Sequence, residues 1–192
     1  MPRDFVVTVT SVDRVGIVSG LSDAILELGG NIDALSQTVM RGYFTLIATV
    51  EFDEDRTCDA VADAVRAKGR SGELGVLVKV RDSSIGGDPV VETADRFILT
   101  MKGPDAKGIV RSITSYLASR NINIEDLYAA IEEGAFLLIA QLEVPAGLET
   151  ERLQMDVQEL WPGPDVQISL QHEDVFLATN KVEFSHSGLA PA

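Results

Sequence analysis

The sequence has few of the residues that metal sites, disulfides and nucleophilic catalysis require. It contains one cysteine, Cys58, and two histidines, His172 and His186, so an internal disulfide is excluded and metal or Cys/His chemistry has few possible ligands. The first residues lack the basic and apolar segments of a secretory signal, and no apolar run approaches the ~20 residues that cross a bilayer. These absences predict a cytoplasmic protein with no metal, no cofactor and no membrane segment.

Basic residues are also scarce. The chain has 16 Lys and Arg against 30 Asp and Glu, which gives a net charge of −14. Both halves share the deficit, with −6 over residues 1–92 and −8 over residues 93–192. Because nucleic-acid affinity depends on clustered Lys and Arg, direct binding to nucleic acid is not expected. The 45% hydrophobic content is that of a globular protein, and 192 residues suit one medium domain or two small ones.

An internal repeat decides between one domain and two. Residues 1–52 align with residues 93–144 at a constant offset of 92, and fifteen positions are identical. The identical positions, numbered in the first copy, are Phe5, Thr8, Asp13, Gly16, Ile17, Val18, Asn31, Ile32, Leu35, Gly42, Phe44, Leu46, Ile47, Ala48 and Glu51. A single register held over this length predicts two copies of one folding unit.

Hydrophobic periodicity predicts the order βαββαβ in each copy. Gly29 and Asn121 are expected to end the first helix of each copy in a left-handed conformation, and Asp13 is expected to cap the start of the first. In the first copy, strands are expected over residues 5–10, 31–39, 43–52 and 74–80, and helices over 17–28 and 57–68. In the second copy, strands are expected over 96–101, 123–131, 135–144 and 166–170, and helices over 109–120 and 148–160.

The fold class predicted from this order is α+β, with two ferredoxin-like domains. Right-handed crossovers turn each βαββαβ unit into a four-stranded antiparallel sheet with two helices on one face. The other face of each sheet is left open, which predicts pairing between sheets of one chain or in a homodimer. The expected bounds are residues 1–82 and 94–172 for the domains, 83–93 for a linker and 173–192 for a C-terminal tail. Residues 173–184 are expected to form a short helix or an extra edge strand.

The junction between the first strand and first helix of each copy is the best candidate site. A helix N-terminus presents unpaired N–H groups, and Gly16 or Gly108 would let a small anion approach them. Asn31 and Asn123 open the next strand with amides that can both donate and accept hydrogen bonds. A purely structural interpretation of these residues, as caps and turns, remains equally open.

Other motifs offer less chemistry. The chain contains no P-loop, no Gly-x-Gly-x-x-Gly, no His-Glu-x-x-His and no Gly-x-Ser-x-Gly motif. The acids at 53–55 are better explained as helix-start residues than as a cation site. Cys58 is expected to be inert and Trp161 to fill the core at a turn. No catalytic role is therefore expected.

The junction sequences resemble those of a known family. Residues 13–18 (DRVGIV) with 29–32 (GGNI), and 103–110 (GPDAKGIV) with 121–124 (NINI), resemble two ACT domains. The resemblance covers about residues 3–172, and a chain made of two such units is similar to the glycine cleavage system transcriptional repressor group. It implies βαββαβ modules that pair side by side or face to face and bind small ligands, typically amino acids, at the pairing interface.

The resemblance also implies which residues bind. The family's junction glycine falls on Gly16 and Gly108. Val15 and Lys107 stand where family members usually have proline, and Ala106 stands at the position of Arg14, so both junctions depart from the family pattern. The implied ligand-binding residues are Asp13, Arg14, Gly16, Ile17, Asn31, Ile32, Asp105, Gly108, Ile109, Asn123 and Ile124.

The resulting functional expectation is a non-catalytic regulatory protein that binds an amino acid, with glycine and serine as first candidates. A homodimer is expected, and the acidic charge favours action through a protein partner over contact with nucleic acid or membrane. The alternative is a scaffold whose paired domains bind proteins independently of any ligand.

Overall fold

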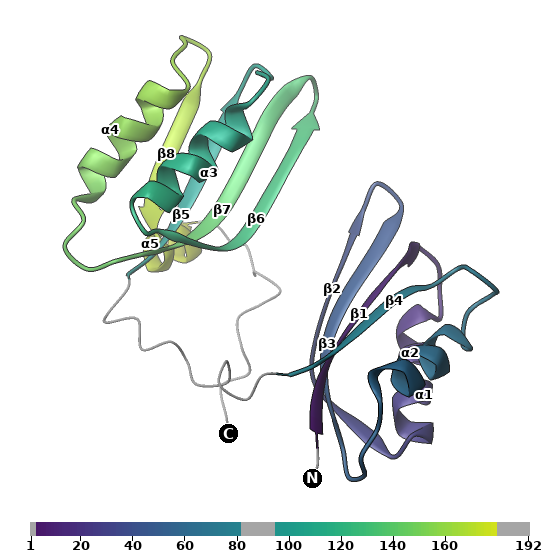
Figure 1. Ribbon diagram of the computed structural model, residues 1–192. Coiled ribbons are helices and arrows are strands. Elements are labelled where there is room, and N and C mark those ends of the chain that lie inside the picture. Colours follow the sequence, from purple (N-terminus) through teal and green to yellow (C-terminus); the bar gives the residue numbers. More distant parts are fainter. Residues whose placement is uncertain (1–2, 82–94, 180–192) are drawn as a thin grey trace. The chain divides into compact units, whose positions relative to one another are not determined.

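The computed structural model describes residues 3–81 and 95–179 (Figure 1). The chain divides into two compact units between residues 88 and 89, here called domain 1 and domain 2, and each is described by itself. The expected linker, residues 83–93, lies outside the described residues. So does the end of the expected tail, residues 180–192, which includes His186.

Domain 1 is a four-stranded antiparallel sheet with two helices. The strand order is β2-β3-β1-β4, so the two strands in the middle of the sheet are β1 and β3. The elements in chain order are β1 (Arg3–Val12), α1 (Ile17–Glu27), β2 (Gly30–Met40), β3 (Tyr43–Phe52), α2 (Cys58–Arg66) and β4 (Gly75–Val80).

Domain 2 repeats this arrangement and adds one short helix. Its strand order is β6-β7-β5-β8, again antiparallel throughout. The elements are β5 (Asp95–Gly103), α3 (Ile109–Ser119), β6 (Asn123–Glu132), β7 (Ala135–Val144), α4 (Thr150–Leu160), β8 (Gln167–His172) and α5 (Glu173–Thr179). The predicted fold class and the order βαββαβ in both copies are therefore confirmed.

Each core lies between one sheet face and its two helices. In β1 alternate residues point to α1 and α2, which leaves Phe5, Val7 and Val9 fully buried. Phe5 meets Phe52 edge to face, with ring centroids 5.6 Å apart. In domain 2 the indole of Trp161 is buried and meets Phe136 in the same way, at 5.7 Å. The prediction that Trp161 fills the core is confirmed.

Short turns with positive φ fix the register and the helix ends. Gly29 (φ 73°) and Asn121 (φ 57°) follow α1 and α3, as predicted. Arg41–Gly42 and Glu133–Gly134 join their strands with φ of 50° or more at both residues of each pair, which matches the twist of a two-residue hairpin. Glycine and asparagine adopt this conformation at least cost, so Gly29, Asn121, Gly42 and Gly134 suit their positions, whereas Arg41 and Glu133 are the unusual residues.

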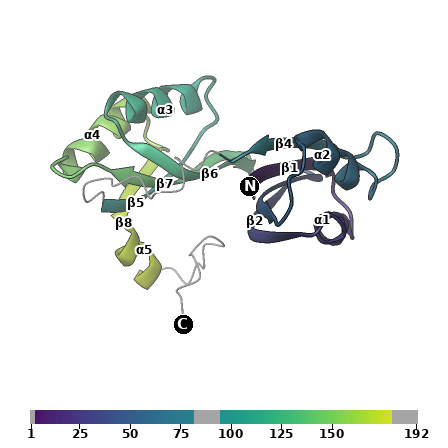
Figure 2. The ribbon, with the colours of Figure 1, turned by 60° about the horizontal axis from the view of Figure 1, so that its bottom comes forward.

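The helix α5 lies on the sheet face opposite α3 and α4 (Figure 2). It follows β8 directly, and Gln141 of β7 donates a 2.7 Å hydrogen bond to the Glu173 carboxylate. Ile98, which points away from α3 and α4, is only 1% exposed and does not belong to the helix-side core. Of the two predicted forms of residues 173–184, the described part is the helix.

Candidate functional site at the strand-helix junctions

The junctions that precede α1 and α3 have the same backbone geometry. Gly16 (φ 95°, ψ 0°) and Gly108 (φ 88°, ψ 1°) are the N-cap residues, both in the left-handed conformation. Neither helix start receives a hydrogen bond from a capping side chain, so the first-turn N–H groups have no side-chain acceptor there. The two helix starts therefore retain the donors and the positive dipole end that suit a carboxylate.

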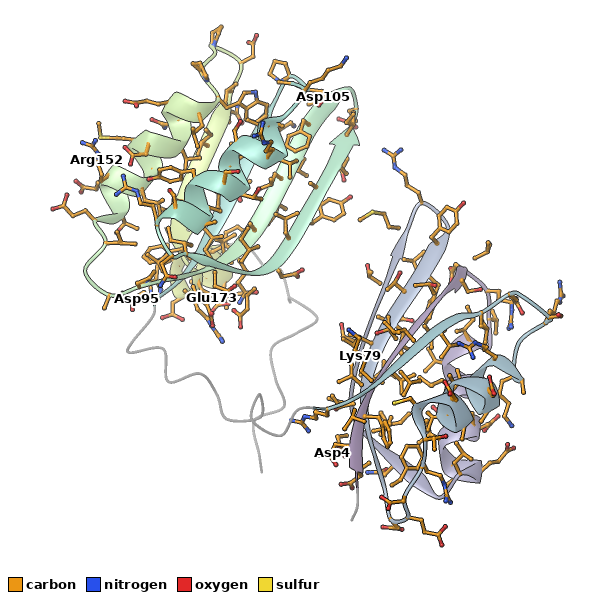
Figure 3. The ribbon with its side chains drawn as sticks, viewed as in Figure 1. Asp4, Lys79, Asp95, Asp105, Arg152 and Glu173 are labelled. Atoms are coloured by element: carbon orange, nitrogen blue, oxygen red, sulfur yellow. The ribbon has the colours of Figure 1, made fainter. Side chains whose placement is uncertain are left out.

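The prediction that Asp13 caps α1 is wrong. Three residues separate Asp13 from Ile17, and the glycine at the cap position has no side chain to accept a hydrogen bond. The backbone N–H of Asp13 instead donates to the carbonyl of Gly42 at 2.8 Å, which attaches the junction to the β2–β3 hairpin. The equivalent Asp105 is exposed, at the end of domain 2 opposite Glu173 (Figure 3).

Arg14 holds the junction of domain 1 against the loop before β4. Its Nε and Nη2 donate to the two carboxylate oxygens of Glu73, at 2.5 and 3.0 Å, and its Nη1 donates to the carbonyl of Val15 at 3.0 Å. Glu73 also accepts a 2.7 Å hydrogen bond from the N–H of Arg70. These donors, Arg14 first, lower the pKa of Glu73 to about 2, and the same contact raises the pKa of Arg14.

The equivalent junction of domain 2 lacks this ion pair. At the offset of 92, Ala106 replaces Arg14 and Asp165 replaces Glu73, so this guanidinium–carboxylate pair cannot form. A pocket of about 360 Å³ lies at this end of domain 2. It is lined by Lys102, Gly103, Pro104, Glu133, Gly134, Ala135, Asp165 and Gln167.

The pocket brings together charged groups that the sequence did not single out. Lys102 supplies an ammonium, and Glu133 and Asp165 supply carboxylates. These are the groups that complement the two charges of a free amino acid. One signal in the sequence could have indicated this pocket: Ala106 and Asp165 stand where the first copy has Arg14 and Glu73. The alignment of the two copies ended at residue 144 and therefore did not include Asp165.

The two asparagines lie at the other end of each domain. Asn31 is the second residue of β2 and lies opposite Glu51, whereas Gly16 follows the far end of β1. The 11 residues of α1 span about 16 Å between them. In domain 2 the Asn123 amide donates to the Glu143 carboxylate at 2.9 Å. Within one domain the structure thus brings no asparagine to the junction glycine.

The predicted isoleucines contribute to packing. Ile17 and Ile109 are 4% and 5% exposed and belong to the two cores. Ile32 and Ile124 are partly buried against the same cores. At Ile17 and Ile109 the side chain is therefore committed to the interior, so these residues can offer a ligand only their backbone, and the N–H of Ile109 already donates to the carbonyl of Ala106 at 3.2 Å.

A second pocket of domain 2, of about 240 Å³, lies between α3 and α4. On its wall the Asp156 carboxylate accepts hydrogen bonds from the Tyr116 hydroxyl (2.6 Å), Arg120 (2.9 Å) and Arg152 (3.0 Å). The Tyr116 contact leads these in lowering the pKa of Asp156, while burial raises the pKa of Tyr116. The cluster joins α3 to α4, and its carboxylate already has three protein donors.

Two other kinds of feature are not found in the described part of the chain. Residues 3–81 and 95–179 include no group of three or more His, Cys, Asp or Glu side chains placed to hold a metal ion. None of the helices in these ranges combines the length and the apolar character that a bilayer crossing demands.

A family model described as the ACT domain matches residues 3–84 and again residues 95–171. The chain belongs to the ACT-domain family. ACT domains typically bind amino acids for regulation. The chain therefore consists of two ACT domains in tandem, and the resemblance drawn from the junction motifs is confirmed.

The relatives by sequence match one ACT domain at a time. A UPF0237 protein of Methanosarcina acetivorans is 38% identical over 93 residues, which are 47% of this chain and 99% of the relative. One from Streptococcus pneumoniae is 39% identical over 80 residues, 42% of this chain and 89% of the relative.

Two solved structures share the tandem fold. A protein of unknown function from Galdieria sulphuraria has a TM-score of 0.70 at 24% identity, covering 90% of this chain and 99% of its own. A protein proposed to be a glycine cleavage system transcriptional repressor has a TM-score of 0.65 at 21% identity, covering 89% and 97%. At these identities the likeness concerns the fold alone and does not identify a ligand.

Proposed function

We propose that this tandem ACT protein is a non-catalytic regulator that binds a free amino acid and passes the binding state to a protein partner. The observation that carries the proposal is the left-handed glycine at both helix starts, which leaves first-turn N–H groups free of side-chain caps. Such a start favours a carboxylate through its donors and its dipole. Glycine and serine are the first candidates, because the tandem resembles the glycine cleavage repressor group.

The ligand is proposed to lie between two ACT units. An amino acid is far shorter than the roughly 16 Å that separate Gly16 from Asn31 along α1. A ligand that meets a junction glycine and an asparagine amide together must therefore take them from different units, in a homo-oligomer such as a homodimer. Such a ligand would stabilise one pairing arrangement over others, which is what a switch requires.

The output is proposed to act on a protein in the cytoplasm. A net charge of −14, shared by both halves of the chain, opposes contact with nucleic acid. Control of glycine cleavage or of another amino-acid pathway would then proceed through a regulated protein partner and not through direct operator binding.

A panel of amino acids tests the proposal by thermal shift and calorimetry, with glycine and serine first. At least one amino acid is expected to raise the melting temperature, and Asn31→Ala and Asn123→Ala are expected to weaken that effect. Gln158→Ala, an exposed amide on α4, serves as the control. If no amino acid binds, or if both asparagine variants bind as the wild type does, the ligand proposal fails.

A ligand-independent scaffold is the second candidate, and two contacts favour it. Arg14 is already paired with Glu73, and the Asn123 amide is already bonded to Glu143. Predicted ligand groups with protein partners are what a relict site would show. Capture of the same protein partner with and without every amino acid of the panel would support this alternative.

A further inference from the structure

A polar cluster lies between α3 and α4 of domain 2, two helices that cover the same face of the sheet (Figure 1). Its centre is the Asp156 carboxylate, which pairs with the guanidiniums of Arg120 and Arg152 at 2.9 and 3.0 Å. The Cζ atom of Arg120 also lies 5.5 Å from the centre of the Tyr116 ring, over its face. These contacts hold both guanidiniums at the wall of the 240 Å³ pocket, here called the α3–α4 pocket.

The equivalent helices of domain 1 pack without this cluster. The helices α2 and α4 begin at Cys58 and Thr150, so the offset of 92 extends through them. At this offset three alanines and a leucine replace the four polar residues of the cluster: Ala24, Leu28, Ala60 and Ala64. A cluster of ion pairs is often no more stabilising than apolar side chains in its place. Joining two helices is therefore not a sufficient reason for this cluster.

A further replacement accompanies the pocket itself. In domain 1 the Arg56 guanidinium reaches the end of α1, where its Nε and Nη2 donate to the carbonyl of Leu28 at 3.1 and 2.9 Å. At the offset of 92, domain 2 has Leu148 in place of this arginine. Leu148 offers no donor, and it lines the α3–α4 pocket. Domain 1 thus bonds its helix end with its own guanidinium, whereas two guanidiniums of domain 2 line a pocket.

The two guanidiniums of the pocket retain donors for a ligand. Each has five N–H groups, and among the described residues the contact with Asp156 occupies one nitrogen of each. The side chains of Arg120 and Arg152 are 43% and 68% exposed, whereas that of Asp156 is 12% exposed. A ligand can therefore reach the guanidiniums more readily than the carboxylate. Guanidiniums held in this way are suited to a second carboxylate, which they can bind through two parallel hydrogen bonds.

The size and charge of the pocket limit what it can bind. At about 30 Å³ for a group the size of a water molecule, 240 Å³ holds about eight such groups. Part of the wall is apolar, since it contains Ile122, Leu148 and Leu153. The lining carries two positive and two negative charges, with Glu149 as the second acid, so it has no excess charge for a dianion. These features favour a small ligand with one carboxylate and a short carbon chain.

We propose that the α3–α4 pocket is a second ligand site, which binds a small aliphatic monocarboxylate through Arg120 and Arg152. The ligand carboxylate accepts hydrogen bonds from both guanidiniums, and its carbon chain contacts the apolar wall. The pocket lies at the end of α3, whereas the junction glycine Gly108 lies at its start. The inference therefore stands or falls apart from the proposal that an amino acid binds at the junctions.

Titration of the isotope-labelled full chain with acetate, propionate and butyrate tests the proposal by NMR, with sodium chloride keeping the ionic strength constant. The arginine Nε–H resonances and the backbone resonances of residues 147–152 should shift saturably. The dissociation constant should fall about fourfold for each added methylene. Arg120→Leu and Arg152→Ala introduce the residues that domain 1 carries, and each should raise the dissociation constant of butyrate at least tenfold. Circular dichroism checks that each variant is folded.

Arg111→Gln is the matched control, because it removes a positive charge from an exposed position of α3 that does not line the pocket. It should bind butyrate as the wild type does. Inorganic phosphate and α-aminobutyrate should bind more weakly than butyrate, since one is a dianion and the other brings an ammonium close to the guanidiniums.

The proposal is overturned if no carboxylate gives saturable shifts at the pocket, or if the folded Arg120→Leu and Arg152→Ala variants bind butyrate as the wild type does. It is also overturned if Arg111→Gln weakens binding as much as the pocket variants. Tighter binding of phosphate or of α-aminobutyrate than of butyrate would assign the pocket to a different class of ligand.

Discussion

At the scale of single residues, the two junctions share a backbone and differ in side chains. The glycines at positions 16 and 108 could be predicted, because a repeated glycine before a helix indicates a conformation that other residues avoid. The pairing of Arg14 with Glu73 could not be predicted, since 59 residues separate them and the partner lies in a loop with no pattern of its own. Tertiary contacts of this kind decide whether a charged side chain is free for a ligand.

The Arg14–Glu73 pair predicts a dependence of stability on acid pH. The pKa of Glu73 falls from its ordinary value near 4.5 to about 2 in the folded chain. A depressed carboxylate pKa stabilises the fold above pH 4.5, and this contribution is lost as the pH falls from about 4.5 towards 2. Wild type should therefore lose more thermal stability across this interval than Glu73→Gln, in melting curves recorded at each pH.

Asp165→Asn is the matched control, because Asp165 stands at the position of Glu73 in domain 2, where an alanine, Ala106, stands at the position of Arg14. Its melting temperature should follow the wild-type pH profile. If the melting temperature of Glu73→Gln changes with pH as that of the wild type does, then Arg14 does not stabilise the charged form of Glu73.

The cap of α1 shows why a residue-level prediction fails even when the element is right. Asp13 is of the correct type for an N-cap, and it lies close to the helix start. The helix begins later, after a left-handed Gly16, and the Asp13 N–H is used by the hairpin carbonyl of Gly42. The residue that caps a helix is the one at which the backbone turns into the helix. Side-chain preference alone does not determine which residue that is.

At the scale of elements, the βαββαβ order followed from periodicity, whereas α5 did not. The sequence from residue 173 suited either a helix or an edge strand. The described residues form a helix that closes over the open sheet face, with Gln141 bonded to Glu173. Local pattern could not decide, because the choice depends on which surface of the finished sheet is available to the chain.

The burial of Ile98 predicts the effect of removing α5. A chain that ends after His172 would expose Ile98 and lose the Gln141–Glu173 hydrogen bond. Restoring a buried isoleucine to solvent costs about 2 kcal/mol, so the free energy of unfolding of domain 2 should fall by about that amount. Urea unfolding followed by the fluorescence of Trp161, the single tryptophan and a core residue of domain 2, measures it.

A chain that ends after Thr179 separates the helix from the residues beyond it. This control keeps α5 and should unfold at the wild-type urea concentration. Equal stability of the two shortened chains would mean that α5 adds nothing to domain 2.

At the scale of the whole molecule, the constant offset of 92 predicted two domains and the structure has two. The residues on the open sheet faces could not be predicted from the repeat alone, because the alignment shows which residues differ between the copies and not which of them face solvent. Only the strand register places Met40, Tyr43 and Val12 in one row. Leu77 lies on the same face because it pairs with Thr8, which faces away from the helices.

The net charge predicts how salt affects self-association. Two copies of charge −14 repel each other, and added salt screens this repulsion. The open sheet face of domain 1 exposes five uncharged side chains, Val12, Met40, Tyr43, Ile47 and Leu77, so a contact through this face would lose few attractive ion pairs in return. The dissociation constant of the pair should therefore fall as sodium chloride is raised, in sedimentation equilibrium. A dissociation constant that rises with salt would place attractive ion pairs at the interface and contradict an apolar contact.

The hydrogen bond from Asp13 to Gly42 connects two surfaces of domain 1. Gly42 lies in the turn between Met40 and Tyr43, which are exposed on the open sheet face. Asp13 lies between the exposed Val12 and the junction glycine. This bond is a direct backbone connection between the hairpin turn and the junction. Under thermodynamic reciprocity, an amino acid that tightens pairing binds more tightly to the pair by the same factor. The abundance of the protein itself would then set the amino-acid concentration to which it responds.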